Sequence, residues 1–462
     1  MASSAIRSIN PATEEVLGTY QPHSKDEIGK KLQAARKAFS DWKKEPFPVR
    51  VGLMRKVAVF LRENKPRLAA NMTAEMGKPI VESEAEIEKC AINCNYYADN
   101  AERFLRDEPR ISSAAESYIQ YTPLGVILAV MPWNYPFWQV FRFAVPALMA
   151  GNTAILKHAS NVPQCALAIE DIFRTAGFPE AVFQTLLVGS SEVPGLIDHP
   201  AVAAVTLTGS EEAGKQVASV AGHALKKTVL ELGGSDPFIV LEDANLDSAI
   251  VTGVRARYQN TGQSCIAAKR FIVVDSVFET FQDRFVEAVK ALNVGNPMDR
   301  STQVGPLARG EFINDLERQI RQSVEKGASI LTGGIRCAGR GYFFEPTVLT
   351  GVQPDMPAGC EEVFGPVAAM IRARDKEHAI QLANRTPYGL GSNLWTEDIE
   401  NAKQLARGIE AGQVFINGMV ASDPRLPFGG IKRSGYGREL SELGLREFVN
   451  IQTVWIGPPS TR

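Results

Sequence analysis

The sequence predicts an α/β protein with two successive regions in which strands alternate with helices. Within 124–232, short apolar segments recur about every 25 residues, with helix-like segments between them, as in a parallel sheet. A second alternation of the same kind follows from 238 to about 433. Because parallel strands need a crossover connection, both regions indicate sheets covered by helices. Right-handed crossovers make the first region a doubly wound, Rossmann-like domain, which binds ligands at the carboxyl ends of its strands.

Before the first alternating region, the chain is expected to be mostly helical. Apolar residues recur there at three- and four-residue steps beside mixed charge, which is typical of amphipathic helices. Ser24 and Glu27 form a capping box at the start of the first of them. The expected helices span 24–44, about 49–75 and about 79–106.

The two alternating regions are each expected to contribute five strands. Those of the first region are Val126–Met131, Thr153–Lys157, Val182–Leu187, Ala203–Thr206 and Thr228–Leu232, with helices at about 137–150, 162–176 and 211–224. Those of the second are Phe238–Leu241, Phe271–Val274, Val367–Ile371, Gly391–Trp395 and Gln413–Asn417, with helices at about 245–257, 276–292, 310–327, 375–385 and 397–409.

Composition excludes several classes of protein. The 462 residues include 50 Lys and Arg against 52 Asp and Glu, so a large basic surface for nucleic acid is not expected. No apolar run approaches the roughly 20 residues that span a bilayer, so no membrane partner is expected. Residues 1–7 lack the apolar part of a signal peptide. The six cysteines are scattered without a Cys-x-x-Cys pair, which predicts no metal site and a reducing, cytoplasmic location.

The segment from Gly209 to Gln216 has two functional interpretations. Its glycines and Lys215 nearly match a P-loop after a strand, which would make the protein a nucleotide hydrolase, but Gln216 replaces the magnesium-binding Ser or Thr. Alternatively, Gly209 and Ser210 cap the following helix and hold a diphosphate at its N-terminus. A strand-to-helix turn with a chance glycine spacing is the structural alternative.

Cys265 stands out because its neighbours in the expected fold are also chemically distinctive. It ends the polar segment Tyr258-Gln-Asn-Thr-Gly-Gln-Ser-Cys265, where backbone amides can stabilise a thiolate. Glu231, followed by Gly233 and Gly234, ends the fifth strand. Asn134 follows the first strand and therefore lies at the same edge of the sheet.

On these motifs, the chain resembles the NAD(P)-dependent aldehyde dehydrogenase superfamily over essentially its whole length. PWNYP, TGS, ELGG, GQSC, EEVFGP and PFGGIKRSG occur in the family's order, and Glu231 precedes Cys265 by 34 residues, which is the family spacing. The resemblance implies a cofactor-binding domain of 1–112 and 129–233 and a catalytic domain of 234–433. It also implies a small β oligomerisation sheet made from 113–128 and 434–462, and hence a homodimer or homotetramer.

The resemblance assigns a role to each motif. Cys265 is expected to attack an aldehyde carbonyl, Asn134 to stabilise the oxyanion, and Glu231 to activate the hydrolytic water. The residues implied in binding the cofactor are Pro132, Trp133, Lys157, Ser160, Gly209, Ser210, Leu232, Glu362 and Phe364.

The substrate is expected to be a small aldehyde that carries a carboxylate. The resemblance places Trp138, Arg142, Gln259, Ser422 and Phe428 along a substrate tunnel. Because a buried cation needs an anion, Arg142 points to a substrate carboxylate, as in the bacterial succinate-semialdehyde dehydrogenase branch. Gln259 stands where many relatives have a second Arg, which leaves glutarate semialdehyde or another small aldehyde open. An ion pair of Arg142 with a neighbouring acid is the structural alternative.

The expected cofactor is NADP, with NAD possible. Many NAD-preferring relatives carry Glu at the position of Ser160, where it would repel a 2′-phosphate. A short neutral hydroxyl removes that repulsion, and Lys157 can approach the phosphate as a point charge. The structural alternative is that Ser160 only caps the following helix.

Overall fold

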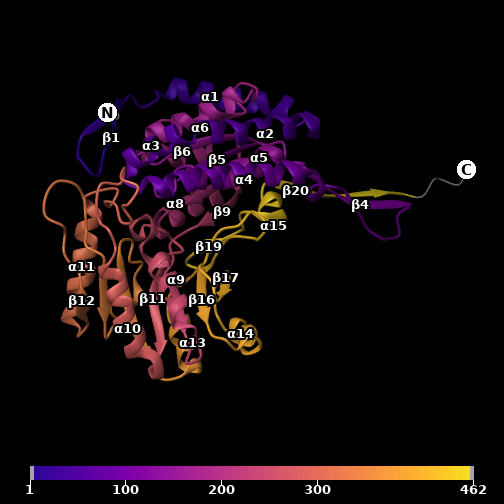
Figure 1. Ribbon diagram of the computed structural model, residues 1–462. Coiled ribbons are helices and arrows are strands. Elements are labelled where there is room, and N and C mark those ends of the chain that lie inside the picture. The colour runs from indigo at the N-terminus through magenta and orange to yellow at the C-terminus, as the bar shows by residue number, and fades with distance from the viewer. Residues whose placement is uncertain (1–4, 458–462) are drawn as a thin grey trace, which may run out of the picture.

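A six-stranded sheet forms the centre of the first α/β region in the computed structural model, which describes residues 5–457 (Figure 1). The five expected strands are present and parallel, and they are almost completely buried, as a sheet covered on both faces requires. A short sixth strand, β19, was not expected and runs antiparallel to β9. In spatial order the strands are β19 (Gly435–Tyr436), β9 (Lys227–Glu231), β8 (Val202–Thr208), β5 (Val126–Met131), β6 (Thr153–His158) and β7 (Phe183–Thr185).

Helices cover both faces of this sheet and bury two separate apolar cores. One face carries α1 (Lys25–Trp42), α7 (Val193–Asp198) and α8 (Glu211–His223). The other carries α2 (Phe47–Glu63), α3 (Lys65–Met76), α4 (Ile80–Phe104), α5 (Trp138–Met149) and α6 (Pro163–Thr175).

The N-terminal helices confirm one local prediction and correct another. The capping box is present, with the backbone N–H of Ser24 donating to Glu27 at 2.7 Å. The single helix expected over 49–75 is wrong, because the chain forms two helices that meet at Asn64. Pro66 lies in the first turn of the second helix, where its missing N–H is tolerated; inside a continuous helix it would break the hydrogen-bond ladder.

The second region contains a seven-stranded sheet, seen below the first in Figure 1. Its five expected strands are present, and β12 and β13 extend one edge as an unexpected antiparallel pair. The order is β12 (Ser329–Thr332), β13 (Thr347–Thr350), β14 (Val367–Ala373), β11 (Ala268–Val274), β10 (Asp236–Val240), β16 (Gly391–Trp395) and β17 (Gln413–Ile416). The accompanying helices are α9 (Leu246–Tyr258), α10 (Asp275–Lys290), α11 (Glu311–Glu325), α12 (Pro357–Cys360), α13 (Lys376–Asn384) and α14 (Ile399–Ala406).

A third sheet projects from the body of the molecule (Figure 1). The two alternating segments are strands, as expected: β4 (Glu116–Pro123) pairs with β20 (Val449–Ile456) over eight residues, and β3 (Glu108–Pro109) adds to the other side of β4. Between β19 and β20 lies α15 (Ser441–Arg446), which contacts α4 and α5. The interval 434–462 therefore contributes to two sheets, since β19 belongs to the six-stranded one. Residues 1–4 of the expected cofactor-binding domain and residues 458–462 of the expected oligomerisation segment lie outside the described residues.

The remaining elements are short: β1 (Ile6–Ile9) pairs with β2 (Val16–Tyr20), β15 (Tyr388–Gly389) pairs with β18 (Ile431–Lys432), and the 3₁₀ turns are Ser190–Glu192 and Gln259–Gly262. Within residues 5–457, no helix is both long enough and apolar enough to cross a membrane.

Candidate active site

Two cavities meet at Cys265. The larger, of about 490 Å³, opens over the carboxyl ends of β5, β8 and β9, where the fold predicts ligand binding. The smaller, of about 250 Å³, lies beside α4 and α5. Both are lined by Cys265 and Gln139, so the thiol is accessible from two separate spaces.

The chain reaches Cys265 through three consecutive residues with positive φ, namely Asn260 (51°), Thr261 (56°) and Gly262 (71°). Left-handed backbone is costly for side-chain-bearing residues, so hydrogen bonds must hold this turn. The Asn260 amide donates to the backbone oxygens of Asn134 at 2.8 Å and Gln263 at 3.1 Å. The polar segment before Cys265 therefore ties the thiol to the end of the first strand.

Burial raises the pKa of the Cys265 thiol to about 12, while the charges of Arg142 and Lys269 act in the opposite direction. Lys269 also holds the backbone, because its Nζ donates to the carbonyl oxygens of Cys265 at 2.7 Å and Ser264 at 2.9 Å. The resting thiol is thus protonated and needs a base before it can attack.

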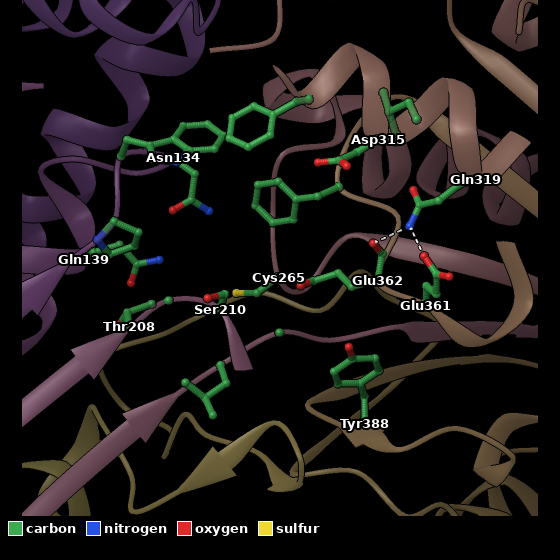
Figure 2. Close-up of a pocket in the computed structure, with 18 of the residues that line it drawn as sticks. Asn134, Gln139, Thr208, Ser210, Cys265, Asp315, Gln319, Glu361, Glu362 and Tyr388 are labelled. Atoms are coloured by element: carbon green, nitrogen blue, oxygen red, sulfur yellow. Dashed lines mark hydrogen bonds between the residues drawn. The ribbon is translucent and has the colours of Figure 1, made fainter. Parts of the chain in front are cut away.

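Asn134 and Cys265 both line the larger cavity, as Figure 2 shows. Its side chain is 4% exposed, and its Nδ2 donates to the backbone oxygen of Gln263 at 3.1 Å. An amide nitrogen has two N–H groups, so one remains for an oxygen atom bound near the thiol.

Glu231 ends β9 and is buried. Neither of its carboxylate oxygens has a hydrogen-bond partner among the described residues. Its pKa is raised well above the ordinary value, first by burial and then by Glu439, while Arg142 opposes the shift. Glu231 itself lines neither cavity, but its strand partner Thr208 and its neighbour Leu232 both line the larger one.

Seven of the nine residues expected to bind the cofactor come together on the wall of the larger cavity: Pro132, Trp133, Gly209, Ser210, Leu232, Glu362 and Phe364. Gly233 explains part of the Glu-Leu-Gly-Gly motif, since a Cβ there would stand 2.4 Å from Oε2 of Glu362. The next N–H, that of Gly234, donates to Glu362 Oε1 at 2.9 Å. This wall is a backbone cradle with a carboxylate set into it, which fits a nucleotide with ribose hydroxyls.

Lys157 lies near the end of β6, the strand beside β5, and Ser160 follows that strand; neither residue lines the larger cavity. Lys157 is 7% exposed, and among residues 5–457 no carboxylate lies within 4.0 Å of its ammonium. Ser160 is exposed, and its hydroxyl makes no hydrogen bond with any described residue. The alternative in which Ser160 caps the next helix is wrong, because α6 begins after Val162 without a side-chain cap.

The P-loop interpretation is also wrong. Lys215 pairs with Glu211 of the same helix at 2.7 Å, its side chain is 61% exposed, and it does not line the larger cavity. A Cβ on Gly214 would stand 2.5 Å from Leu232, so this glycine permits close packing of α8 on the end of β9. Ser210 instead accepts from the backbone N–H of Ala213 and caps α8.

The smaller cavity brings together all five residues expected in the substrate tunnel, which are Trp138, Arg142, Gln259, Ser422 and Phe428. Arg142, however, forms an ion pair with Glu439, and the two side chains are 2% and 3% exposed. The Arg142 guanidinium also lies over the Phe428 ring, 4.3 Å from its centre. The alternative in which Arg142 pairs with a neighbouring acid is therefore confirmed. Glu439 supplies the anion for Arg142, so a substrate carboxylate is not needed to neutralise it.

Residues that the sequence reasoning missed also line the smaller cavity, among them Glu82, Glu86, Lys89 and Arg255. The spacing of three of these residues in the sequence could have revealed them. Glu82, Glu86 and Lys89 are four and three residues apart within a predicted helix, so they share one helix face.

A comparison with protein families matches residues 1–454 to the aldehyde dehydrogenase family. The chain belongs to the aldehyde dehydrogenase family. It is 55% identical over 452 residues to the probable succinate-semialdehyde dehydrogenase [NADP(+)] of Synechocystis sp., covering 98% of this chain and 100% of that protein. It is 53% identical to the succinate-semialdehyde dehydrogenase [NADP(+)] of Mycobacterium avium, covering 98% and 97%.

Solved structures agree with this assignment. The crystal structure of succinic semialdehyde dehydrogenase from Streptococcus pyogenes, in complex with NADP⁺, superposes with a TM-score of 0.96 at 38% identity and covers 98% of this chain and 100% of that one. The resemblance and the fold class read from the motifs are confirmed.

Proposed function

We propose that this protein oxidises succinate semialdehyde to succinate and uses NADP as the oxidant. The observation that carries the proposal is the position of Cys265. This thiol lies where the larger cavity, lined by seven of the nine expected cofactor residues, meets the smaller cavity, which is lined by Lys89 and Arg255 as well as by acids. The names of the Synechocystis and Mycobacterium avium relatives support both the aldehyde and the cofactor.

Cys265 is the nucleophile in this proposal. The thiol first releases its proton to water, and the sulfur then adds to the aldehyde carbonyl to form a thiohemiacetal, whose oxygen carries the negative charge. The free N–H of the Asn134 side chain and the backbone N–H of Cys265 donate to that oxygen. Asn134 is held for this task by its bond to Gln263 and by the Asn260 amide on its own carbonyl.

The larger cavity holds the cofactor. When bound, NADP supplies the acceptor for the hydride that leaves the thiohemiacetal carbon. Glu362 accepts hydrogen bonds from the ribose, and Phe364 and Trp133, whose rings meet edge to face at 5.8 Å, form an apolar wall. Gly209 and Ser210 hold the diphosphate at the N-terminus of α8. Loss of hydride leaves a thioester on Cys265.

Glu231 is the base for hydrolysis of that thioester. A general base works best when its pKa lies near the working pH, and burial raises the pKa of this carboxyl in that direction. Both Glu231 oxygens lack hydrogen-bond partners in the described part of the chain, but the side chain is buried and lines neither cavity. In this proposal Glu231 turns toward the larger cavity, which its neighbour Leu232 lines, to reach the hydrolytic water.

The preference for NADP is assigned to the end of β6. Lys157 has no acid partner within the described residues, and Ser160 is short, neutral and exposed. Together they accommodate a 2′-phosphate by charge and by a hydroxyl donor. NAD remains a second, poorer cofactor, and glutarate semialdehyde is a second candidate substrate because Gln259 replaces an expected Arg.

The projecting sheet is proposed to join subunits in a homodimer or a dimer of dimers. Ile451, Trp455 and Ile456 on β20 are exposed apolar residues along an edge strand, and such edges are usually paired. All six cysteines are free, which fits a cytoplasmic protein.

The test is the appearance of reduced-nicotinamide absorbance with purified protein, NADP and either succinate semialdehyde or butanal. We expect kcat/KM to be at least about tenfold higher for the carboxylated aldehyde, since a charged hydrogen bond contributes about 1.5–3 kcal/mol. Cys265→Ala serves as the control and should show no turnover. Equal efficiency on the two aldehydes would refute the substrate assignment, and turnover by Cys265→Ala would refute the mechanism.

A further inference from the structure

Lys89 extends from α4 to the wall of the smaller cavity, the same cavity that Cys265 lines. Its Nζ donates to the hydroxyl of Ser422 at 2.7 Å and lies over the Trp138 ring, 4.3 Å from the ring centre. The side chain is partly buried, and these two contacts position the ammonium.

No carboxylate among residues 5–457 lies within 4.0 Å of this ammonium. The nearby acids are committed elsewhere. Glu86 pairs with Lys78 and accepts from the backbone N–H groups of Phe137 and Trp138, each at 2.9 Å. Glu82 accepts from the N–H of Asn260 at 2.7 Å. Lys89 is therefore a partly buried cation with no carboxylate within ion-pair distance, which is costly unless a ligand supplies an anion.

Ser422 reinforces this arrangement. Its Oγ accepts from Lys89 and also from Nε1 of Trp138 at 2.9 Å. With both lone pairs occupied by donors, its own hydrogen must point to a third group. Lys89 retains N–H groups that Ser422 does not use, so the pair presents several donors and no competing acceptor.

Arg142 lines the same cavity but, unlike Lys89, already has a carboxylate partner. Its guanidinium already pairs with the buried carboxylate of Glu439. An anion that approached Arg142 would have to displace Glu439 or share its charge.

We propose that Lys89, positioned by Ser422 and Trp138, binds the carboxylate of the aldehyde substrate in place of Arg142. The proposal rests on the proposed function, because it names the residue that recognises the acid end of that substrate. Cys265 and Lys89 line one cavity of about 250 Å³, so a short aldehyde acid reaches both groups.

The test compares kcat/KM for succinate semialdehyde with kcat/KM for butanal in the holoenzyme and in four variants, Lys89→Met, Lys89→Arg, Lys56→Met and Arg255→Met. Lys89→Met removes the charge at similar length, and the ratio of the two efficiencies is expected to fall about 10- to 100-fold, chiefly through KM for the acid. Lys89→Arg should restore most of the ratio. Lys56→Met, which removes an exposed lysine on α2, should leave the ratio unchanged. If Lys89→Met does not yield folded protein, Lys89→Gln gives the same comparison.

The possible results distinguish a failure of the role of Lys89 from a failure of the substrate assignment. An unmodified enzyme that prefers succinate semialdehyde, together with a Lys89→Met variant that keeps the preference, overturns the role of Lys89 alone. Loss of the preference in Arg255→Met, but not in Lys89→Met, assigns the carboxylate to the exposed arginine at the cavity wall and also overturns it. An unmodified enzyme without any preference removes the substrate assignment itself.

Discussion

The two cavities that meet at Cys265 have differently constructed walls. Around the larger one, backbone comes close to the ligand space, as at Gly233, where any Cβ would meet Glu362, and at the N-terminus of α8. Around the smaller one, long side chains form the wall, and three of them are held by other side chains. Trp138 and Lys89 both donate to Ser422, and Arg142 pairs with Glu439.

This difference shows which kind of site a sequence reveals. A wall made from backbone needs glycines and caps at fixed positions, and these form short motifs. A wall made from side chains depends on which partners meet in space, and those partners come from distant parts of the chain. Substitutions at Glu231, Arg142, Ser160 and Gly233 distinguish the two walls and the chemistry between them, with expected effects that decrease in that order.

Glu231→Gln tests the junction. We expect one rapid burst of reduced cofactor per active site and then a steady rate lower by about 100- to 1000-fold, because the thioester forms but water lacks its base. The pKa of Glu231 is raised in the folded protein, so steady turnover of the unmodified enzyme should fall as pH drops through that raised value, and this limb should vanish in the variant. Stopped-flow absorbance measures both phases. Steady turnover equal to that of the unmodified enzyme would remove Glu231 from the mechanism.

Arg142→Met tests the ion pair of the smaller cavity. It leaves the buried carboxylate of Glu439 without a partner and should lower the free energy of unfolding by about 3–5 kcal/mol. Arg142→Met combined with Glu439→Gln should regain most of the loss, as measured by urea denaturation. The double variant should also keep its preference for the carboxylated aldehyde. If the preference disappears while stability returns, Arg142 is the carboxylate anchor after all.

Ser160→Glu tests the nucleotide end of the larger cavity. A carboxylate there repels the 2′-phosphate and accepts from the ribose hydroxyls, so the ratio of kcat/KM for NADP over NAD should fall about 30- to 100-fold, equivalent to about 2–3 kcal/mol. The kcat for either cofactor should change little. Ser160→Ala is the matched control, because it removes the hydroxyl without adding charge. An unchanged ratio in Ser160→Glu would place the 2′-phosphate elsewhere.

Gly233→Ala tests the backbone cradle and has the smallest expected effect. The added Cβ would lie 2.4 Å from Glu362 Oε2, and the displaced carboxylate should raise KM for NADP about tenfold, equivalent to about 1.4 kcal/mol. The ratio of efficiencies for the two aldehydes should not change. Gly222→Ala, where a Cβ meets nothing within 4 Å, is the control and should leave KM unchanged. A tenfold effect in both variants would show that the cradle is not its cause.

Most of the architecture could be predicted from local patterns. The buried strands β5, β6 and β11 contain the apolar runs Val126–Met131, Ala154–Leu156 and Phe271–Val274, because both faces of their sheets are covered. Two of the elements that differ from the prediction are the strand β19, whose sequence is too short to show a pattern, and the helix expected over 49–75, which contains a proline. The two-residue strand β19 has no periodicity to detect, since it forms only by pairing with β9. Pro66 was visible in the sequence and was sufficient to divide the helix expected over 49–75.

The sequence by itself determined the class of fold and the location of the chemistry. Cys265, Asn134 and the Glu-Leu-Gly-Gly motif each depend on a few adjacent residues that set a turn, a strand end or a close approach of backbone, and such local geometry is encoded locally. Only the tertiary structure decided which cation at the smaller cavity has a carboxylate partner and which has none among the described residues. Arg142 pairs with Glu439 and Lys89 donates a hydrogen bond to Ser422, and both partners come from the C-terminal part of the chain. The free energy of a buried charge depends on what surrounds it in three dimensions, so residue type alone cannot distinguish a neutralised cation from one that awaits an anion.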